Sequence, residues 1–550
     1  MNEKIHFTLR REQGLVKTGN ISQKELTALF EHQRKAFLAS DREDWSDRRR
    51  RLVRLRELIS GNADRLAQAV SEDFHGKPVE EVYLAEISQI LSEIDLMLAQ
   101  GPVWSRTRRV RTPWMFFPAT SSLCPAPRGV IGVLGAWNYP LAISLTPVVD
   151  ALAAGNRILM KLPERSPVTS TLLAELVDNA FDATELAAIS GGPDLAQEFT
   201  RLPFNLLVYT GGGVVGRAVM REASIHLTPV LLELGGKSQT LVARGADLAH
   251  AARRILVGKL LNAGQTCIAP DVVRVHRDDM ASFLSELKNQ ARRLCPDPRA
   301  LSALIDLRHA RHVSGLLKEA VELGATSDEI VPAVSGDVLR PALVAVIDPP
   351  ADSRIAREEI FGPALVLTSY TDIDREIAQL RALEETPLAL YWFDTDQRRI
   401  ERVSQTVPCG GITVNDTLLH YAQNRLPFGG VGSCGMGAYH GKAGFDAMSR
   451  MIPVFGNGQT AIEFFSEEKM INKNTIAPVD PAKVYRLLNI GPTTVVSAAF
   501  DGKVDALAVA WACNLDLMPC KASVVVDKTH YTRALIEKSG YFALQLPTVS

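Results

Sequence analysis

Apolar and polar positions divide the chain into three kinds of pattern. Over residues 22–101, apolar residues recur at the three- and four-residue spacing of one helix face. From Gly129 to about residue 407, short apolar runs bounded by turn-forming residues alternate with helix-length stretches. This alternation predicts βαβ units around a mostly parallel sheet, and therefore an α/β fold.

The clearest predicted elements lie in the first half of the chain. We expect strands at Gly129–Leu134, Arg157–Lys161 and Leu206–Tyr209, with helices at Ser170–Phe181 and from about Gly216.

Beyond about Phe455 the pattern changes. A polar stretch predicts a junction over residues 456–481. The following residues, 482–550, contain short strand-like runs and one helix-like stretch: Thr494–Ala499, Ala506–Trp511, Ser523–Asp527 and Tyr531–Ser539.

Length and charge are those of an ordinary globular protein of about three domains. The 550 residues are 46% hydrophobic and 22% charged, with a formal net charge of −1, so neither nucleic acid nor an anionic membrane is an expected partner. Of two local basic runs, Arg48–Arg51 lies in a helical pattern and predicts a solvated face, whereas Arg106–Arg111 predicts a loop or extended link. The first residues lack an apolar signal core, and no run of about 18 apolar residues occurs, so we expect a cytoplasmic protein.

Seven cysteines are spread along the chain without a Cys-x-x-Cys pair. This pattern predicts neither a disulfide framework nor a zinc site, and we expect no metal.

One cysteine, Cys267, lies in the turn-like stretch LNAGQTCIAP after a helical run. A thiol becomes a good nucleophile as its thiolate, which backbone N–H groups favour, and such a turn is a plausible place for them. Taken alone, Cys267 is better explained as a buried structural residue. Asn138, Glu233 and Glu359 change this balance, because each lies in a distinctive motif of its own.

A glycine-rich turn, Thr210–Gly216, follows the strand at Leu206–Tyr209. It matches the Gly-x-Gly-x-x-Gly string of dinucleotide sites, where glycines let backbone N–H groups approach a pyrophosphate. A packed strand-to-helix turn gives the same string. Taken whole, the match would also make Glu233 a ribose ligand rather than a catalytic base.

Five motifs carry a resemblance to a known family. They are GAWNYP with Asn138, LELGGKS with Glu233, NAGQTCIAP with Cys267, EEIFGP with Glu359, and LPFGGVGSCGMGAYHGKAGFD from Leu426. In this order they resemble the aldehyde dehydrogenase superfamily over residues 20–455. The likeness is greatest to the class 3 branch and, within it, to coniferyl aldehyde dehydrogenases.

The resemblance implies a role for each matching residue. Cys267 matches the nucleophile, Glu233 the general base, and Asn138 the amide of the oxyanion hole. The implied cofactor site consists of Lys161 and Glu164 at the adenosine ribose, Glu359 and Phe361 at the nicotinamide ribose and ring, and Trp137, Thr210, Gly211 and Gly216 around them.

The implied reaction is NAD(P)-dependent oxidation of an aldehyde to its acid through a thiohemiacetal and a thioester on Cys267. The implied substrate is coniferyl aldehyde or another aromatic or bulky hydrophobic aldehyde, and the implied assembly is a homodimer. The implied fold has a Rossmann-like NAD(P)-binding domain (1–103 and 125–230), an α/β catalytic domain (231–410) and an oligomerisation arm (104–124 and 411–455).

Two departures from the family pattern concern the cofactor. The usual Phe-Thr-Gly-Ser turn reads Tyr-Thr-Gly-Gly from Tyr209, so a hydroxyl expected at the pyrophosphate is absent. The usual Pro before Trp137 is Ala136. Glu164 would repel a 2′-phosphate, so we expect NAD to be favoured, while the class 3 branch also accepts NADP.

The last part of the chain, residues 482–550, resembles the first half of a flavin reductase-like, FMN-binding split barrel. It is shorter than that family's domain, as a fusion cut short or a gene-junction artefact would be. An open half barrel leaves strand edges unpaired, so we expect weak FMN binding or none. Lys528, His530 and Thr532 could face a phosphate, but a solvated turn explains them better.

Three rival functions remain open on the sequence. A CoA-acylating or acyl-reducing relative would share Cys267 but commonly lacks the base at Glu233. A catalytically idle structural or binding protein would not need both residues together with Asn138. A flavin-dependent reductase would need the second half of the barrel.

Overall fold

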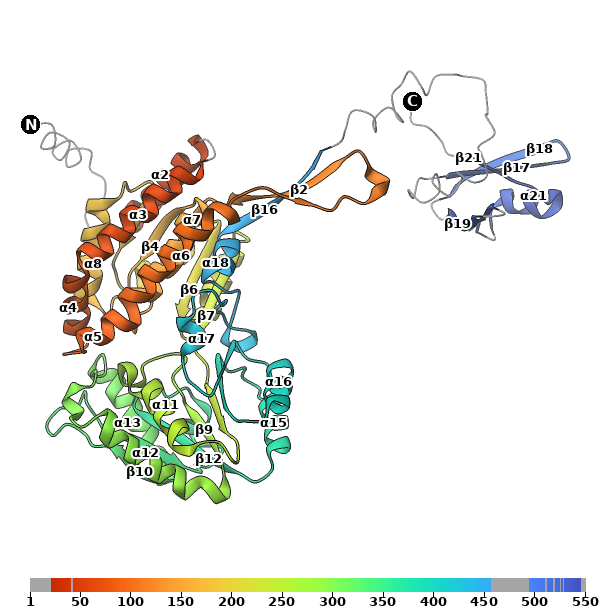
Figure 1. The fold of residues 1–550 in the computed structure, drawn as a ribbon. Helices are drawn as coiled ribbons and strands as arrows, with labels where there is room; N and C mark the ends of the chain where they lie inside the picture. The colour runs from red at the N-terminus through yellow and green to blue at the C-terminus, as the bar shows by residue number, and fades with distance from the viewer. Residues whose placement is uncertain are drawn as a thin grey trace, which may run out of the picture. The chain divides into compact units, whose positions relative to one another are not determined.

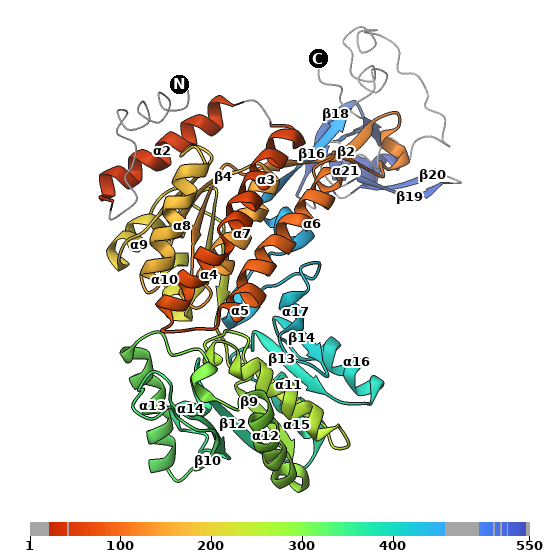
Figure 2. The same ribbon diagram turned by 60° about the vertical axis from the view of Figure 1, so that its left-hand side comes forward.

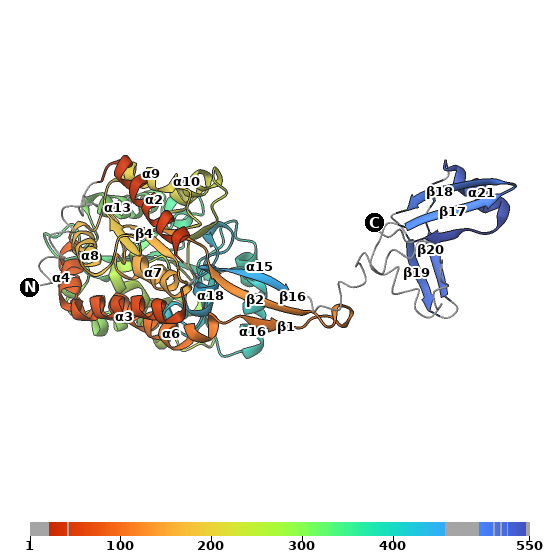
Figure 3. The same ribbon diagram turned by 90° about the horizontal axis from the view of Figure 1, so that it is seen from above.

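The structure, a computed structural model, describes residues 21–40, 43–456, 494–509, 512–517, 520–524, 526–527 and 529–545. Figures 1, 2 and 3 show it from three directions. The chain divides into two compact units, one with residues up to Arg108 and Leu123–Pro453, the other with Arg109–Ser122 and residues from Val454 onward. The predicted junction lies outside the described residues except for Gly456.

The first sheet has six strands in the order β15-β7-β6-β3-β4-β5. Strands β3 to β7 are parallel to their neighbours, as the alternating pattern predicted, and β15 is antiparallel to β7. The strands are β3 (Val130–Leu134), β4 (Arg157–Lys161), β5 (Leu186–Ile189), β6 (Leu206–Gly211), β7 (Val230–Leu234) and β15 (Gly435–Met436).

Helices cover both faces of this sheet because alternate strand residues point to opposite sides. Ile131 and Val133 of β3 pack in one core with α3, α6, α7 and α8, and Figure 1 shows α3, α6 and α7 side by side. Val130 and Leu134 pack in a second core with α2, α9 and α10. The helices here are α2 (Gln23–Ala39), α3 (Trp45–Gly61), α4 (Ala63–Asp73), α5 (Val79–Val82), a π-helical turn (Tyr83–Ile87), α6 (Ser88–Trp104), α7 (Ala142–Ala154), α8 (Pro167–Ala180), α9 (Pro193–Thr200) and α10 (Gly213–Ser224).

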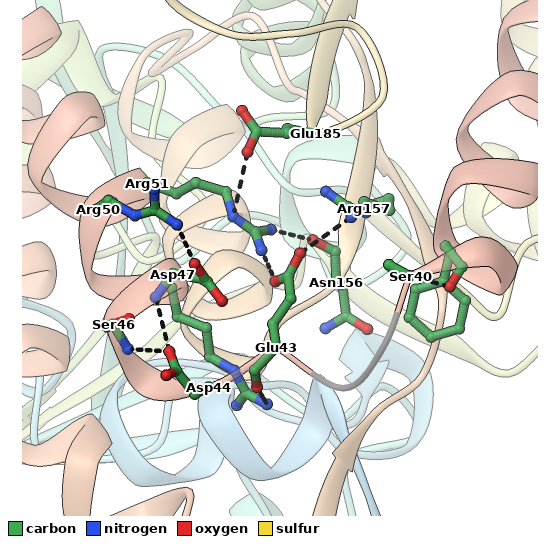
Figure 4. Close-up of polar contacts among 12 residues, drawn as sticks. Ser40, Glu43, Asp44, Ser46, Asp47, Arg50, Arg51, Asn156, Arg157 and Glu185 are labelled. Carbon is green, nitrogen blue, oxygen red and sulfur yellow. Dashed lines mark hydrogen bonds and ion pairs between the residues drawn. The ribbon is translucent and has the colours of Figure 1, made fainter.

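The basic run in α3 is only partly a solvated face. Arg48 and Arg51 are each 2% exposed, so the prediction is wrong for these two, whereas the two arginines between them face solvent. Residues three apart lie on one side of a helix, and this side faces the sheet. Arg51 forms ion pairs with Glu43 and Glu185, and Glu43 also pairs with Arg157 at 3.0 Å (Figure 4).

The second sheet has seven strands in the order β10-β11-β12-β9-β8-β13-β14, parallel except for β10. Helices α11 and α12 cover one face, and α13, α15 and α16 cover the other. The elements are β8 (Gln239–Val242), α11 (Leu248–Leu260), β9 (Val272–His276), α12 (Met280–Leu294), α13 (Leu307–Glu322), β10 (Thr326–Val331), β11 (Leu343–Ile347), α14 (Arg354–Arg357), β12 (Ala364–Tyr370), α15 (Ile373–Arg381), β13 (Ala389–Phe393), α16 (Gln397–Thr406), β14 (Gly411–Val414) and α17 (Leu419–Ala422). Helix α18 (Gly441–Ala447) packs instead on α6 and α7 of the first part.

Strand pairing does not follow the predicted domain borders at 230/231 and 410/411. Strand β7 extends the first sheet through its pairing with β6, and β14 extends the second through its pairing with β13. Which sheet a strand belongs to depends on its pairing with residues far along the chain, and the local sequence pattern does not show that pairing. The functional names given to these parts remain predictions.

A three-stranded sheet is formed by β1 (Arg108–Val110), β2 (Thr120–Pro127) and β16 (Ser449–Gly456), in the order β1-β2-β16. Residues 106–111 are exposed, as predicted for an extended link. No helix among the described residues has the length and apolar character needed to cross a membrane.

The C-terminal residues form two small antiparallel sheets, seen in Figure 3. The predicted helix has the expected bounds, and its Thr532 is buried and hydrogen-bonded to Asp505, whereas His530 is exposed and Lys528 lies outside the described residues. The likeness to a split barrel remains a prediction. The elements are β17 (Thr494–Phe500), β18 (Lys503–Val509), β19 (Ala512–Leu517), β20 (Cys520–Val524), α21 (Tyr531–Ser539) and β21 (Ala543–Gln545), in the orders β18-β17-β21 and β19-β20.

Candidate active site

The carboxyl ends of the first sheet's strands line a cleft of about 720 Å³. The strand order reverses between β3 and β6, and in open α/β sheets ligands bind at such a point. Loops of the second α/β part provide the opposite wall. The predicted site residues that line this cleft are Trp137, Asn138, Lys161, Glu164, Thr210, Gly211, Glu233, Cys267, Glu359 and Phe361.

Cys267 follows an unusual turn after α11. Asn262, Ala263 and Gly264 all have left-handed backbone angles, with φ of 50°, 51° and 75°. Such angles are uncommon for residues other than glycine and cluster at functional sites. The Asn262 side chain holds the turn by donating hydrogen bonds to the carbonyl oxygens of Asn138, at 2.8 Å, and Gln265, at 3.2 Å.

The thiol of Cys267 is partly exposed and lies at the end of this turn. Burial raises its pKa, and the nearby carboxyl groups of Glu359 and Glu233 raise it further, which outweighs the backbone N–H groups of Cys267 and Ile268. The expectation that the turn would lower the thiol pKa is therefore wrong. Because burial and the two carboxyl groups all disfavour the thiolate, Cys267 rests as a thiol.

Glu233 ends strand β7 and is 2% exposed. Its Oε1 atom accepts a hydrogen bond from the Gly430 N–H at 3.3 Å, whereas its buried Oε2 atom has no hydrogen-bond partner among the described residues. Burial raises the pKa of this carboxyl well above its usual value, and the Gly430 N–H opposes the shift only in part. A carboxyl group with a raised pKa and a free oxygen is suited to accept a proton near neutral pH.

Asn138 follows strand β3 and is 4% exposed. Its side-chain Nδ2 donates to the Gln265 carbonyl oxygen at 3.2 Å, which orients the amide beside the cysteine turn. Because an amide nitrogen carries two N–H donors, this bond leaves one for a ligand. The next residue, Tyr139, is bonded through its hydroxyl to Thr266 Oγ1 at 2.7 Å, so both residues are tied to the turn.

Lys161 and Glu164 form an ion pair at the end of strand β4. Burial would raise the pKa of Glu164, but the hydrogen bond and charge of Lys161 outweigh it and lower the pKa. Glu164 is therefore ionised at neutral pH, and both of its carboxylate oxygens can accept hydrogen bonds.

Trp137 lies among aromatic and charged groups at the cleft. Its ring is 5.5 Å from those of Phe361 and His309, edge to face, and the Arg165 guanidinium lies 4.2 Å above it. Phe361 has a left-handed φ of 50°, and its carbonyl oxygen is bonded to His309 Nε2 at 2.8 Å.

Gly216 does not line the cleft, although the sequence predicted it in the cofactor site. A Cβ atom there would lie 2.4 Å from Leu234 Cδ2, so this glycine lets α10 pack closely on β7. By contrast, a Cβ atom at Gly212 would meet no atom within 4 Å. A ligand in the cleft can therefore approach the protein backbone at the N-terminus of α10.

Comparisons with known proteins decide the family. The model of the aldehyde dehydrogenase family matches residues 9–454. The chain belongs to the aldehyde dehydrogenase family. It is similar to a Pseudomonas aeruginosa protein named "Probable coniferyl aldehyde dehydrogenase", at 39% identity over 78% of this chain and 90% of the relative. It is also similar to mouse aldehyde dehydrogenase family 3 member A2, at 36% identity over 77% of this chain and 87% of the relative.

Solved structures give the same result. A substrate-bound Staphylococcus aureus AldH superposes with a TM-score of 0.75 and 32% identity, covering 80% of this chain and 95% of that one. This aldehyde dehydrogenase therefore has the class 3 relatives and the α/β fold that the five motifs implied, and it oxidises aldehydes with NAD or NADP.

The cleft fits the dinucleotide that the family uses. Its volume lies within the range of about 300–1,000 Å³ typical of cofactor sites. The N-terminus of α10 offers backbone N–H groups for a pyrophosphate. Lys161, Glu164, Glu359 and Phe361 all line it together with Cys267.

Several residues at the aldehyde dehydrogenase site were not singled out from the sequence. Asn262 and Gln265 lie inside the cysteine motif, and Lys237 and Asp271 each follow a predicted catalytic residue by four positions. The sequence signal that could have identified Lys237 and Asp271 is a charged residue placed among glycine and apolar residues. His309 had none, because α13 brings it to the cleft from far along the chain.

Proposed function

We propose that this aldehyde dehydrogenase oxidises aromatic or other bulky hydrophobic aldehydes, such as coniferyl aldehyde, with Cys267 as nucleophile, Glu233 as general base and Asn138 in the oxyanion hole. The proposed roles rest on one observation. The three side chains line one cleft, and the Oε2 atom of Glu233 has no hydrogen-bond partner among the described residues. The substrate class rests on the relatives named for coniferyl aldehyde in three Pseudomonas and Caulobacter strains.

In the proposed reaction the Cys267 sulfur attacks the aldehyde carbon, and its proton is lost to solvent. The second N–H of the Asn138 amide, with a backbone N–H, stabilises the oxyanion that forms. The nicotinamide, which Glu359 and Phe361 would hold, would supply the hydride acceptor, so that loss of hydride from this carbon leaves a thioester on Cys267. Glu233 then takes a proton from water, whose oxygen attacks the thioester carbon; the C–S bond breaks, the acid is released, and Glu233 returns the proton to the Cys267 sulfur.

The free oxygen of Glu233 favours hydrolysis over acyl transfer to CoA. A base that is buried, has a raised pKa and lacks a partner is arranged to activate a small nucleophile such as water.

We propose NAD as the preferred cofactor, with NADP also accepted. Glu164 is ionised and would repel a 2′-phosphate, whereas its carboxylate can accept hydrogen bonds from both ribose hydroxyls. Lys161, paired with Glu164, supplies the neighbouring positive charge.

A homodimer in the cytoplasm is the proposed working form. Trp114, Met115 and Phe117 are 72%, 65% and 83% exposed in the predicted oligomerisation arm, a density of apolar side chains typical of an interaction surface. A catalytic thiol also needs a reducing compartment to stay free.

A panel of aldehydes tests the substrate class. NADH formation should show kcat/KM values at least about tenfold higher for coniferyl and other aromatic aldehydes than for acetaldehyde, since one additional methylene bound in an apolar pocket contributes roughly 10–200-fold. Equal values across the panel, or a preference for short aldehydes, would contradict the proposed substrate class.

A further inference from the structure

One buried ion pair holds the loop that carries Glu359. The ammonium group of Lys237 donates to Asp271 Oδ1 at 2.5 Å and to the Glu358 carbonyl oxygen at 2.8 Å. The other oxygen of Asp271 accepts from the Ile360 N–H at 2.9 Å. The pair is therefore hydrogen-bonded to the backbone on both sides of Glu359.

The same pair lies close in sequence to both proposed catalytic residues. Lys237 follows Glu233 by four residues, and Asp271 follows Cys267 by four. The Asp271 N–H donates to the Ser238 carbonyl oxygen at 3.2 Å, which joins the two segments just before β8 and β9. Lys237 is 8% exposed and Asp271 2%, so the pair is screened little by water.

The side chain of Glu359 lies closely against these segments. A Cβ atom at Gly235 would come within 2.0 Å of Glu359 Oε2, so the absence of a side chain there makes room for the carboxyl group. Burial raises the pKa of Glu359 to about 8, with a further contribution from Asp271, whereas Lys237, the Gly236 N–H and Lys259 favour its ionised form.

We propose that Lys237 and Asp271 are a positioning pair that fixes the Glu358–Ile360 loop, so that Glu359 faces the nicotinamide ribose. This inference rests on the proposed role of Glu359 in cofactor binding. The pair touches neither substrate nor the reacting atoms. It acts through the loop, and its loss should weaken cofactor binding while leaving the chemistry of Cys267 in place.

Two reactions of one protein separate this role from a general structural one. NADH binding, followed by the change in its fluorescence, reports on the Glu359 loop. Hydrolysis of p-nitrophenyl acetate without cofactor needs only a thiol that is acylated by the ester and a base that activates water, here Cys267 and Glu233. It reports on the nucleophile and base alone.

The variants are Lys237→Met and Asp271→Asn, with the double variant Lys237→Met/Asp271→Leu in case a lone buried charge prevents folding. The matched control is Lys288→Met, which removes the lysine of another Lys–Asp pair, with Asp328 at 2.6 Å, in the second α/β part. We expect the Kd for NADH to rise about tenfold or more in the pair variants, the effect of losing hydrogen bonds to a charged group. Ester hydrolysis should stay within about twofold, and the control should change neither.

An unchanged Kd in the folded variants would overturn the inference. So would an equal loss of ester hydrolysis, because the pair would then merely build the cysteine turn. The proposed function fails separately, if Cys267→Ser retains ester hydrolysis and NADH formation.

Discussion

Replacing Glu233 with glutamine tests whether Glu233 acts in thioester hydrolysis and not in the earlier attack by Cys267. The substitution keeps the size of the side chain and an oxygen for the Gly430 N–H, which now lies 3.3 Å from Oε1. It removes the group that can take a proton from water. It also removes one of the two carboxyl groups that raise the pKa of Cys267, so formation of the thiolate becomes easier rather than harder.

The expected magnitude follows from these two effects. A general base contributes roughly 10²–10⁴ in rate, which at about 1.4 kcal/mol per tenfold is about 3–5 kcal/mol of barrier. This loss falls on thioester hydrolysis. Acylation and hydride loss should keep their rates, so each active site should still form one NADH before turnover slows.

Rapid mixing with aldehyde and NAD, followed by NADH absorbance, gives both quantities in one trace. We expect a burst of about one NADH per site and a steady rate lowered by roughly 10²–10⁴. Loss of the burst together with turnover would refute the reasoning, because Glu233 would then serve the cofactor or the fold. Thermal unfolding provides the control. Since the pKa of Glu233 is raised in the folded state, its burial costs stability as pH rises, and the variant should be no less stable in alkali.

Three further predictions concern the cofactor and the C-terminal segment. Burial raises the pKa of Glu359 to about 8, and an ionised carboxylate accepts hydrogen bonds more strongly, so the proposed role of Glu359 at the ribose predicts that the Kd for NAD falls as pH rises from about 6.5 to 9; a flat titration would contradict this. Glu164→Gln should narrow the preference for NAD over NADP in kcat/KM by roughly tenfold, as loss of one charge repulsion allows, and an unchanged ratio would contradict the role of Glu164. Truncation after Phe455 should leave aldehyde oxidation within about twofold and improve solubility, because among the described residues β17 to β21 leave strand edges unpaired. Saturable binding of FMN at low micromolar concentration to the full chain would contradict the interpretation of that segment.

The sequence predicted β3, β4 and β6 of the first sheet and the C-terminal helix, because each of these elements has a strong local signal. Arg157–Lys161 matches β4 residue for residue, and α21 matches the stretch Tyr531–Ser539. Strand pairing was not predictable in the same way. Strand β7 joins β6 although the pattern grouped it with the residues that follow, because pairing depends on partners far along the chain.

At the site, the motifs brought together ten of the predicted residues but did not give their electrostatics. The raised pKa of Cys267 depends on burial and on Glu359, which lies about 90 residues away in sequence. The buried arginines of α3 were missed for the same reason, since their burial depends on contacts that the local sequence does not show. A basic helix face is solvated unless other residues cover it, and here Glu43 and Glu185 form ion pairs with Arg51.

The central claim is that the aldehyde becomes a thioester on Cys267. Its most direct test is mass spectrometry of the Glu233→Gln variant, quenched in acid after mixing with aldehyde and NAD. We expect the peptide containing Cys267 to gain the mass of the aldehyde less two hydrogens, and we expect Cys267→Ser to abolish both this adduct and NADH formation. An unmodified Cys267 at full NADH burst, or the adduct on another cysteine, would contradict it.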